Sequence, residues 1–274
     1  MPTSASLQAQ TETLLMPDVD ADGCPIHVQV EGAERAPVLM LSNSLGTNLH
    51  MWDPQVALLT RHFRLLRYDS RGHGRSGVPK GPYSIERLGR DVVTVLDALG
   101  IERVHWCGLS MGGMVGQWLG ANAPGRINKL ILSNTASYYP DKTLWFDRIK
   151  LVREKGLAAL VDSNMERWFT KQFRERSPQT VAAVRDMFAT TSADGYIACG
   201  AAIRDMDLRP LLPRIKAPTL VIAGRFDPAT PLHMSAFIRA QIPGARLIVL
   251  ETAHIANIEQ PQAYADAVLE FLLS

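Results

Sequence analysis

Val104-His-Trp-Cys-Gly-Leu-Ser-Met-Gly-Gly-Met-Val115 is the stretch that indicates the fold most directly. Its centre has the pattern Gly-x-Ser-x-Gly around Ser110, with an apolar run before it and a helical pattern after it. The glycines leave room for a tight, strained turn that lifts the serine hydroxyl between a strand and a helix. The alternative is a glycine-rich turn whose serine is passive. The setting favours a reactive serine at the edge of an α/β sheet.

Short apolar runs alternate with helical patterns along the chain, which is typical of a mostly parallel sheet flanked by helices. Apolar residues at helical spacing after Ser84 predict a helix that stops at Gly100. A second helix is expected to begin at Met111, and the last to run from about 261 to 273. The expected strands cover residues 37–41, 64–68, 104–107, 129–132, 219–223 and 247–250.

The strand signals stop between residues 138 and 212, where aromatic residues and helical spacing take over. We interpret this part as a helical lid inserted into the sheet domain, and the alternative is a separate helical domain. Long excursions of this kind are uncommon in a compact domain unless they have a function. The predicted organisation is an α/β core over 1–137, the lid over 138–212 and the rest of the core over 213–274.

A serine hydroxyl needs a base to become a good nucleophile, and the base needs an acid to orient it. On a strand–serine–helix turn of this kind, the expected chain order is serine, acid, histidine. His254 follows the predicted strand 247–250 by a short loop, and Asp227 lies just beyond the predicted strand 219–223. Ser110, Asp227 and His254 are therefore the expected catalytic triad.

An aspartate or histidine near a strand end can also have a purely structural role. Asp227 with Pro228 could simply make a turn. His233 lies at the start of a helical pattern and is expected to be a surface or capping residue. Asp69 ends a strand but precedes the serine, which breaks the expected order, so we expect it to support the turn over residues 71–76.

An oxyanion formed at the serine would need backbone N–H donors. The first is expected from Met111, where the helix after the serine begins. The second is expected from the loop after the strand 37–41, with the N–H of Leu45 as the candidate. Asn43 in the same loop is expected either to orient the loop or to bind a substrate oxygen.

Composition argues against several other classes of protein. The 274 residues carry a net charge of +2, so nucleic-acid binding is not expected. No apolar run is long enough to span a membrane, and residues 1–13 lack a signal-peptide pattern. The three widely spaced cysteines suggest neither a disulfide framework nor a zinc site. With no nucleotide or metal motif, we expect a cytoplasmic protein without cofactor or metal, whose oligomeric state is left open.

With these residues identified, the chain resembles the 3-oxoadipate enol-lactonases, a family with the α/β-hydrolase fold. The resemblance covers nearly the whole chain, and the run that begins with Asn43 and ends at Gln55 is its most family-specific part. Asn43-Ser44 stands where many hydrolases carry His-Gly, which is a departure in the oxyanion loop. The segments that carry the resemblance are 41–55, 67–77, 108–117, 223–231 and 253–261.

The resemblance implies a reaction in aromatic (protocatechuate, or β-ketoadipate) catabolism in which water opens 3-oxoadipate enol-lactone to 3-oxoadipate. Ser110 would attack the lactone carbonyl, and His254 would activate the water that releases the product. A small anionic lactone needs a partner for its carboxylate, and arginine suits that role. Trp145 and Arg148, which can share one face of a lid helix, are the candidate substrate contacts.

Two other functions remain open at this stage. Another carboxylesterase or a carbon–carbon bond hydrolase would share the fold and the triad, and would be expected to have a larger, apolar pocket. A ligand-binding receptor with weak hydrolysis would also share the fold. A small pocket with an arginine would favour the enol-lactone.

Overall fold

The computed structural model describes residues 14–15 and 18–274. Its main element is an eight-stranded sheet in the order β1-β4-β6-β5-β7-β8-β9-β10, and β2 pairs with β3 in a separate small sheet. The segment 1–13, for which we expect no secretion signal, lies outside the described residues. The strands are β1 (Leu14–Leu15), β2 (Val19–Asp20), β3 (Pro25–Ile26), β4 (Val28–Glu31), β5 (Val38–Ser42), β6 (Arg64–Tyr68), β7 (Val104–Leu109), β8 (Ile127–Ser133), β9 (Thr219–Gly224) and β10 (Arg246–Leu250).

All six predicted strands are present, and the pairs from β6 through β10 are parallel. β5, β7, β8 and β9 are mostly buried on both faces, as their apolar runs predict. Sequence analysis missed β4, which pairs antiparallel with β6. This strand has only four residues, Val-Gln-Val-Glu, and two of them are polar, so it gives no apolar run that would predict a strand.

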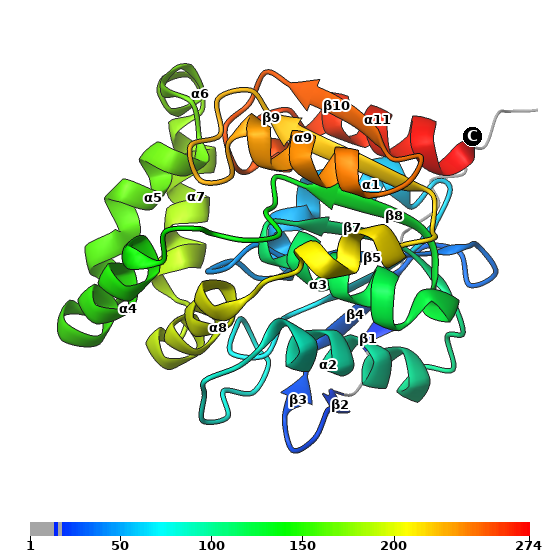
Figure 1. Ribbon diagram of the computed structural model, residues 1–274, viewed down its shortest axis with the longest axis horizontal. Helices are drawn as coiled ribbons and strands as arrows, with labels where there is room; N and C mark the ends of the chain where they lie inside the picture. The colour runs from blue at the N-terminus through cyan, green and yellow to red at the C-terminus, as the bar shows by residue number, and fades with distance from the viewer. Residues whose placement is uncertain (1–13, 16–17) are drawn as a thin grey trace, which may run out of the picture.

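Helices cover both faces of the sheet (Figure 1). The predicted helix after Ser84 is α2 (Ile85–Ala98), and the Ser84 side chain accepts a hydrogen bond from the N–H of Arg87, as an N-cap does. The predicted final helix is α11 (Pro261–Leu273). The other helices of this part are α1 (Asp53–Leu59), α3 (Met111–Asn122), α9 (Leu232–Gln241) and α10 (Ala256–Glu259), with 3₁₀ turns η1 (Leu49–Trp52), η2 (Pro124–Arg126) and η4 (Arg209–Arg214).

Five helices follow β8 before the chain returns to the sheet at β9. Figure 1 shows them gathered on one side of the molecule, and α4 packs against α8. Several hydrogen bonds attach them to the sheet domain. Among these, the Ile255 N–H donates to the Trp168 carbonyl, and the Thr191 hydroxyl donates to the Gly46 carbonyl. We call this part the helical segment: α4 (Thr143–Lys155), η3 (Leu157–Leu160), α5 (Val161–Trp168), α6 (Lys171–Arg176), α7 (Pro178–Ala189) and α8 (Ala193–Asp205).

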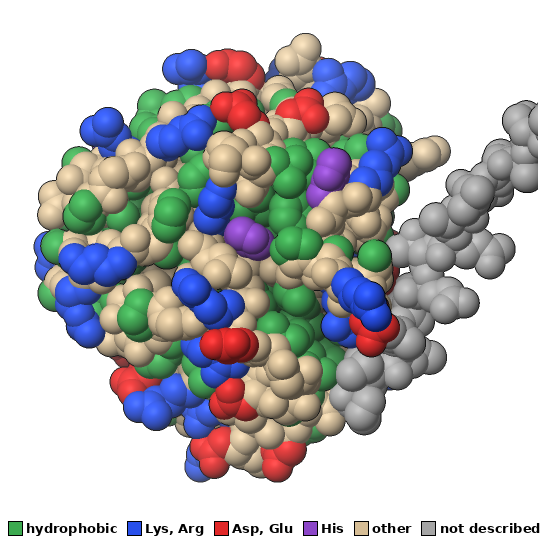
Figure 2. Space-filling model, turned by 90° about the vertical axis from the view of Figure 1, so that its right-hand side faces the viewer, with side chains coloured by type: hydrophobic (Ala, Val, Ile, Leu, Met, Phe, Trp, Pro, Cys, Tyr) green, Lys and Arg blue, Asp and Glu red, His purple; other side chains and the backbone are tan. Residues whose placement is uncertain are grey.

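The face opposite the helical segment mixes acidic and basic side chains (Figure 2). Interspersed charges of both signs produce no strong field of one sign, so steering of a charged ligand depends on groups nearer its site. Within the described residues, no helix is long and apolar enough to cross a membrane.

Candidate active site

Ser110 joins β7 to α3 on a strained turn. Its φ of 56° and ψ of −113° are unusual for a residue with a side chain. The turn needs its glycines, because a Cβ on Gly108 would lie 2.1 Å from the Gly112 carbonyl oxygen. A Cβ on Gly112 would lie 2.3 Å from the Ser42 carbonyl oxygen. The predicted tight, strained turn is therefore confirmed.

Asp227 and His254 form a hydrogen-bonded pair. Nδ1 of His254 lies 2.8 Å from Oδ2 of Asp227, and both side chains are buried. Asp227 also accepts hydrogen bonds from the Thr230 hydroxyl at 2.6 Å, the Ala229 N–H at 2.8 Å and the Asn134 amide at 3.1 Å. Burial alone would raise the pKa of Asp227, but the charge of His254 and the hydrogen bonds from His254 and Thr230 outweigh burial and lower the pKa. An ionised carboxylate therefore orients the imidazole.

Ser110 and His254 line one pocket, which lies between the sheet domain and the helical segment. The pocket is narrow, with a cavity volume of about 40 Å³. None of its lining residues is acidic, and two are arginines. The lining residues are Ser44, Leu45, Ser110, Met114, Tyr139, Leu144, Trp145, Arg148, Asn164, Arg167, Trp168, Tyr196, Ile203, Ala229 and His254.

The two backbone donors proposed for an oxyanion are available. Leu45 lines the pocket, and Met111 is the first residue of α3, directly after Ser110. Among the described residues, neither N–H has a hydrogen-bond partner. A backbone N–H at a helix start is well suited to stabilise negative charge.

The structure does not support a substrate contact by Asn43. Its side chain is fully buried, donates to the Tyr68 carbonyl over 2.7 Å and accepts from the Trp52 indole over 3.0 Å. The residue is absent from the pocket lining. Both ends of the amide are engaged within the protein, which favours the loop-orienting alternative.

Trp145 and Arg148 both lie in the pocket lining, on α4. The guanidinium of Arg148 donates to the Tyr196 hydroxyl and to Oδ1 of Asn164, the latter over 2.7 Å. It also lies 5.7 Å from the centre of the Trp145 ring. None of these partners is negatively charged, so the positive charge of Arg148 is not neutralised by its hydrogen bonds.

Sequence analysis missed Asn164 and Arg167, both on α5, and Tyr196 on α8. Their helical spacing predicts amphipathic helices, but it carries no information on which helix faces the serine. Only the packing of α4 and α8 brings Tyr196 within hydrogen-bond distance of Arg148. No single-sequence signal identifies these residues.

Asp69, His233 and the three cysteines are not part of the pocket lining. Asp69 supports the turn, since its carboxylate accepts hydrogen bonds from the N–H groups of Leu49 and Arg75, each over 2.8 Å. His233 is exposed near the start of α9. The three cysteines are buried free thiols.

This chain is similar to known proteins over most of its length. The model of the alpha/beta hydrolase fold family matches residues 37–261. The chain is 45% identical to 3-oxoadipate enol-lactonase 2 of Acinetobacter baylyi, over 86% of this chain and 89% of that protein. It is 38% identical to 3-oxoadipate enol-lactonase 1 of the same organism, over 92% and 94%. The crystal structure of the enol-lactonase from Burkholderia xenovorans LB400 superposes with a TM-score of 0.93 at 44% identity, covering 94% of this chain and 100% of that one. The chain therefore belongs to the alpha/beta hydrolase fold family and, within it, groups with the 3-oxoadipate enol-lactonases.

Proposed function

We propose that this protein hydrolyses 3-oxoadipate enol-lactone to 3-oxoadipate. The observation that carries the proposal is the narrow pocket beside Ser110, which is lined by arginine and contains no acidic residue. Such a pocket suits a small anion better than a large aryl ester. The identity to 3-oxoadipate enol-lactonases from Acinetobacter baylyi supports the same substrate.

In this proposal Ser110 is the nucleophile and His254 the base. Nε2 of His254 takes the hydroxyl proton as Oγ attacks the lactone carbonyl, and Asp227, bonded to Nδ1, stabilises the resulting imidazolium. The oxyanion of the tetrahedral intermediate accepts hydrogen bonds from the N–H groups of Leu45 and Met111. These donors are fixed by the backbone before the reaction starts, so they need no reorganisation as charge develops.

Collapse of the intermediate breaks the bond between the acyl carbon and the ring oxygen. The imidazolium of His254 returns its proton to the departing enol, which remains attached because acyl and enol parts belong to one molecule. The enol then ketonises. Water, deprotonated by His254, attacks the acyl-enzyme and releases the second carboxylate.

The substrate carboxylate is assigned to Arg148. Its hydrogen-bond partners, Tyr196 and Asn164, are neutral, so they orient the guanidinium without cancelling its charge. Trp145 packs against this group and limits the size of the pocket. We include in the proposal that the helical segment, predicted as residues 138–212, acts as the lid of the site. We also include a cytoplasmic location, which the three free thiols favour.

The test is hydrolysis of enzymatically generated 3-oxoadipate enol-lactone, with neutral p-nitrophenyl acetate as the comparison substrate. We expect kcat/KM on the lactone to exceed that on the ester by at least about a hundredfold, because only the lactone has a carboxylate for Arg148. Turnover of the ester with no turnover of the lactone would keep the serine mechanism and reject the lactone as substrate. A protein that binds the lactone but does not turn it over repeatedly would instead be a receptor.

A further inference from the structure

Arg167 is a second cation in the pocket, and the proposed mechanism does not use it. It lies on α5, one residue before Trp168, and lines the same pocket as Ser110 and Arg148. Among the described residues, its side chain has neither a hydrogen bond nor an ion pair. Partial burial, followed by the positive charge of Arg148, lowers the pKa of Arg167. A partly buried, unpaired guanidinium is costly unless a ligand compensates it.

Two further donors in the pocket also lack acceptors. The indole Nε1 of Trp145 and the amide Nδ2 of Asn164 are buried without a hydrogen-bond partner. Asn164 is almost fully buried, and its Oδ1 is occupied by Arg148, so only its N–H₂ group is available. Nη1 of Arg148 is likewise without a partner among the described residues.

The four unpaired groups just named, on Arg167, Trp145, Asn164 and Arg148, belong to one chemical class. They are all N–H donors, and the pocket lining contains no carboxylate that could accept from them. Buried donors are normally satisfied, so a whole set of unsatisfied ones indicates a ligand rich in acceptor oxygens. Two guanidinium groups near each other also repel, and that repulsion is relieved most by a ligand with two negative charges.

We propose that Arg167 is a second anion contact and that the pocket is built to bind a small dicarboxylate. One carboxylate meets Arg148, Asn164 and Trp145, and the other meets Arg167. This inference rests on the proposed function for the identity of the natural ligand, because opening a monoanionic lactone releases a dicarboxylate. Arg167 then recognises the charge that the reaction creates, and the product is a competitive inhibitor of its own formation.

The test uses adipate and hexanoate, which have six carbons each and differ by one carboxylate. Neither has an ester bond, so binding to the unmodified enzyme can be followed by titration calorimetry. We expect adipate to bind at least about tenfold more tightly than hexanoate, as an additional charge-assisted contact implies. In Arg167→Gln we expect the Kd of adipate to rise at least about tenfold and the Kd of hexanoate to rise less than about threefold.

Arg153→Gln is the matched control, because Arg153 is exposed on α4 and does not line this pocket. It should leave both dissociation constants unchanged. Arg167→Lys keeps the charge and should recover part of the adipate affinity. Equal affinity of the unmodified enzyme for adipate and hexanoate would overturn the inference, even if Arg167→Gln did not fold. An adipate affinity that Arg167→Gln leaves unchanged would also overturn it.

The two proposals fail separately. A protein that binds adipate through Arg167 but does not hydrolyse the enol-lactone refutes the proposed function and leaves the dicarboxylate pocket in place. A protein that hydrolyses the lactone but binds adipate no more tightly than hexanoate refutes only the role of Arg167.

Discussion

The imidazole of His73 accepts a hydrogen bond at Nε2 from the backbone N–H of Gly46, over 2.9 Å. Gly46 follows Leu45, so this bond holds the loop that carries a proposed oxyanion donor. Nδ1 of His73 lies 3.3 Å from the Arg71 carbonyl oxygen and must donate to it, which fixes the neutral tautomer with its proton on Nδ1. Burial lowers the pKa of His73 to about 4.

The first prediction is that the protein loses stability in mild acid because His73 becomes protonated in the unfolded chain. The pKa of His73 is lower in the folded state than the value of about 6.5 expected in the unfolded chain, so the unfolded state binds more protons between these values. His73 therefore makes its full contribution to the free energy of unfolding above pH 6.5. This contribution, about 3 kcal/mol in total, is lost as the pH falls from 6.5 to 4. Urea unfolding at pH 7.5, 5.5 and 4.5 should show this decline.

His73→Gln should make the decline shallower, because glutamine can accept from Gly46 without titrating. The matched control is His233→Gln, since His233 is exposed on α9 and no hydrogen bond involves its side chain among the described residues. That variant should follow the unmodified protein. Identical pH dependence in all three proteins would contradict the assignment.

Replacement of the nucleophile is the second prediction. Ser110→Ala should reduce kcat by at least about 10⁴-fold, because loss of a triad nucleophile removes the covalent route. The fold should be retained, since within the described part of the chain only the backbone of Ser110 forms hydrogen bonds in the turn. Ester hydrolysis and a thermal melt check both parts. Retained turnover in a folded variant would exclude Ser110 as the nucleophile.

Most of the fold and the pairing of Asp227 with His254 were predictable because both depend on local signals. Asp227 and His254 each follow a strand that its apolar run identifies, and parallel strands bring their carboxyl ends to one edge. Arg167 and Asn164 could not be predicted in the same way. Their place in the pocket depends on the packing of α5 against the sheet domain, and long-range packing is not encoded in the spacing along one helix.

Asn43 also shows that long-range contacts cannot be predicted from the sequence. Its position in the loop after β5 was correctly predicted, but a polar residue near a reactive serine can serve either the ligand or the loop. The partners at Tyr68 and Trp52 favour the loop, and the sequence around Asn43 does not reveal these partners.

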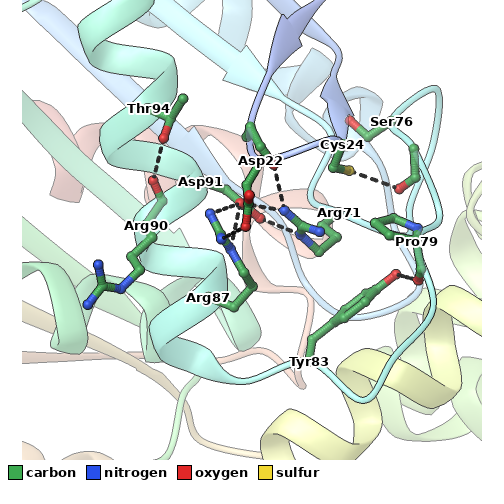
Figure 3. A network of polar contacts seen from close by, with 12 residues as sticks. Asp22, Cys24, Arg71, Ser76, Pro79, Tyr83, Arg87, Arg90, Asp91 and Thr94 are labelled. Atoms are coloured by element: carbon green, nitrogen blue, oxygen red, sulfur yellow. Dashed lines mark hydrogen bonds and ion pairs between the residues drawn. The ribbon is translucent and has the colours of Figure 1, made fainter.

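The third prediction concerns the buried ion pair between Arg71, in the same loop as His73, and Asp91 on α2. Nε and Nη2 of Arg71 each donate to the carboxylate of Asp91 over 2.8 Å, and both side chains are at most 5% exposed (Figure 3). The hydrogen bonding of Arg71 to the Asp91 carboxylate is the main cause that raises the pKa of Arg71. Asp91→Asn should destabilise the protein by about 3–5 kcal/mol, because it leaves a buried guanidinium without its counter-charge.

Glu86→Gln on the same helix, α2, is the control for that measurement. Glu86 pairs with Arg90 over 2.8 Å, but both side chains are more than half exposed, so the loss should be below about 1 kcal/mol. Urea unfolding at pH 7.5 compares the two variants. Similar losses for Asp91→Asn and Glu86→Gln would mean that the buried pair has no special weight.

The last prediction separates substrate binding from chemistry. Arg148→Met removes the charge but keeps the apolar stem that packs near Trp145. If Arg148 holds the substrate carboxylate, KM for the enol-lactone should rise about ten- to a hundredfold, as expected for a lost charge-assisted contact. Hydrolysis of neutral p-nitrophenyl acetate should change by less than about threefold, because that substrate has no carboxylate. Arg153→Met, an exposed change on α4, should alter neither reaction. A KM for the lactone that Arg148→Met leaves unchanged would move the carboxylate contact to another residue, and Arg167 is the other guanidinium in the pocket lining.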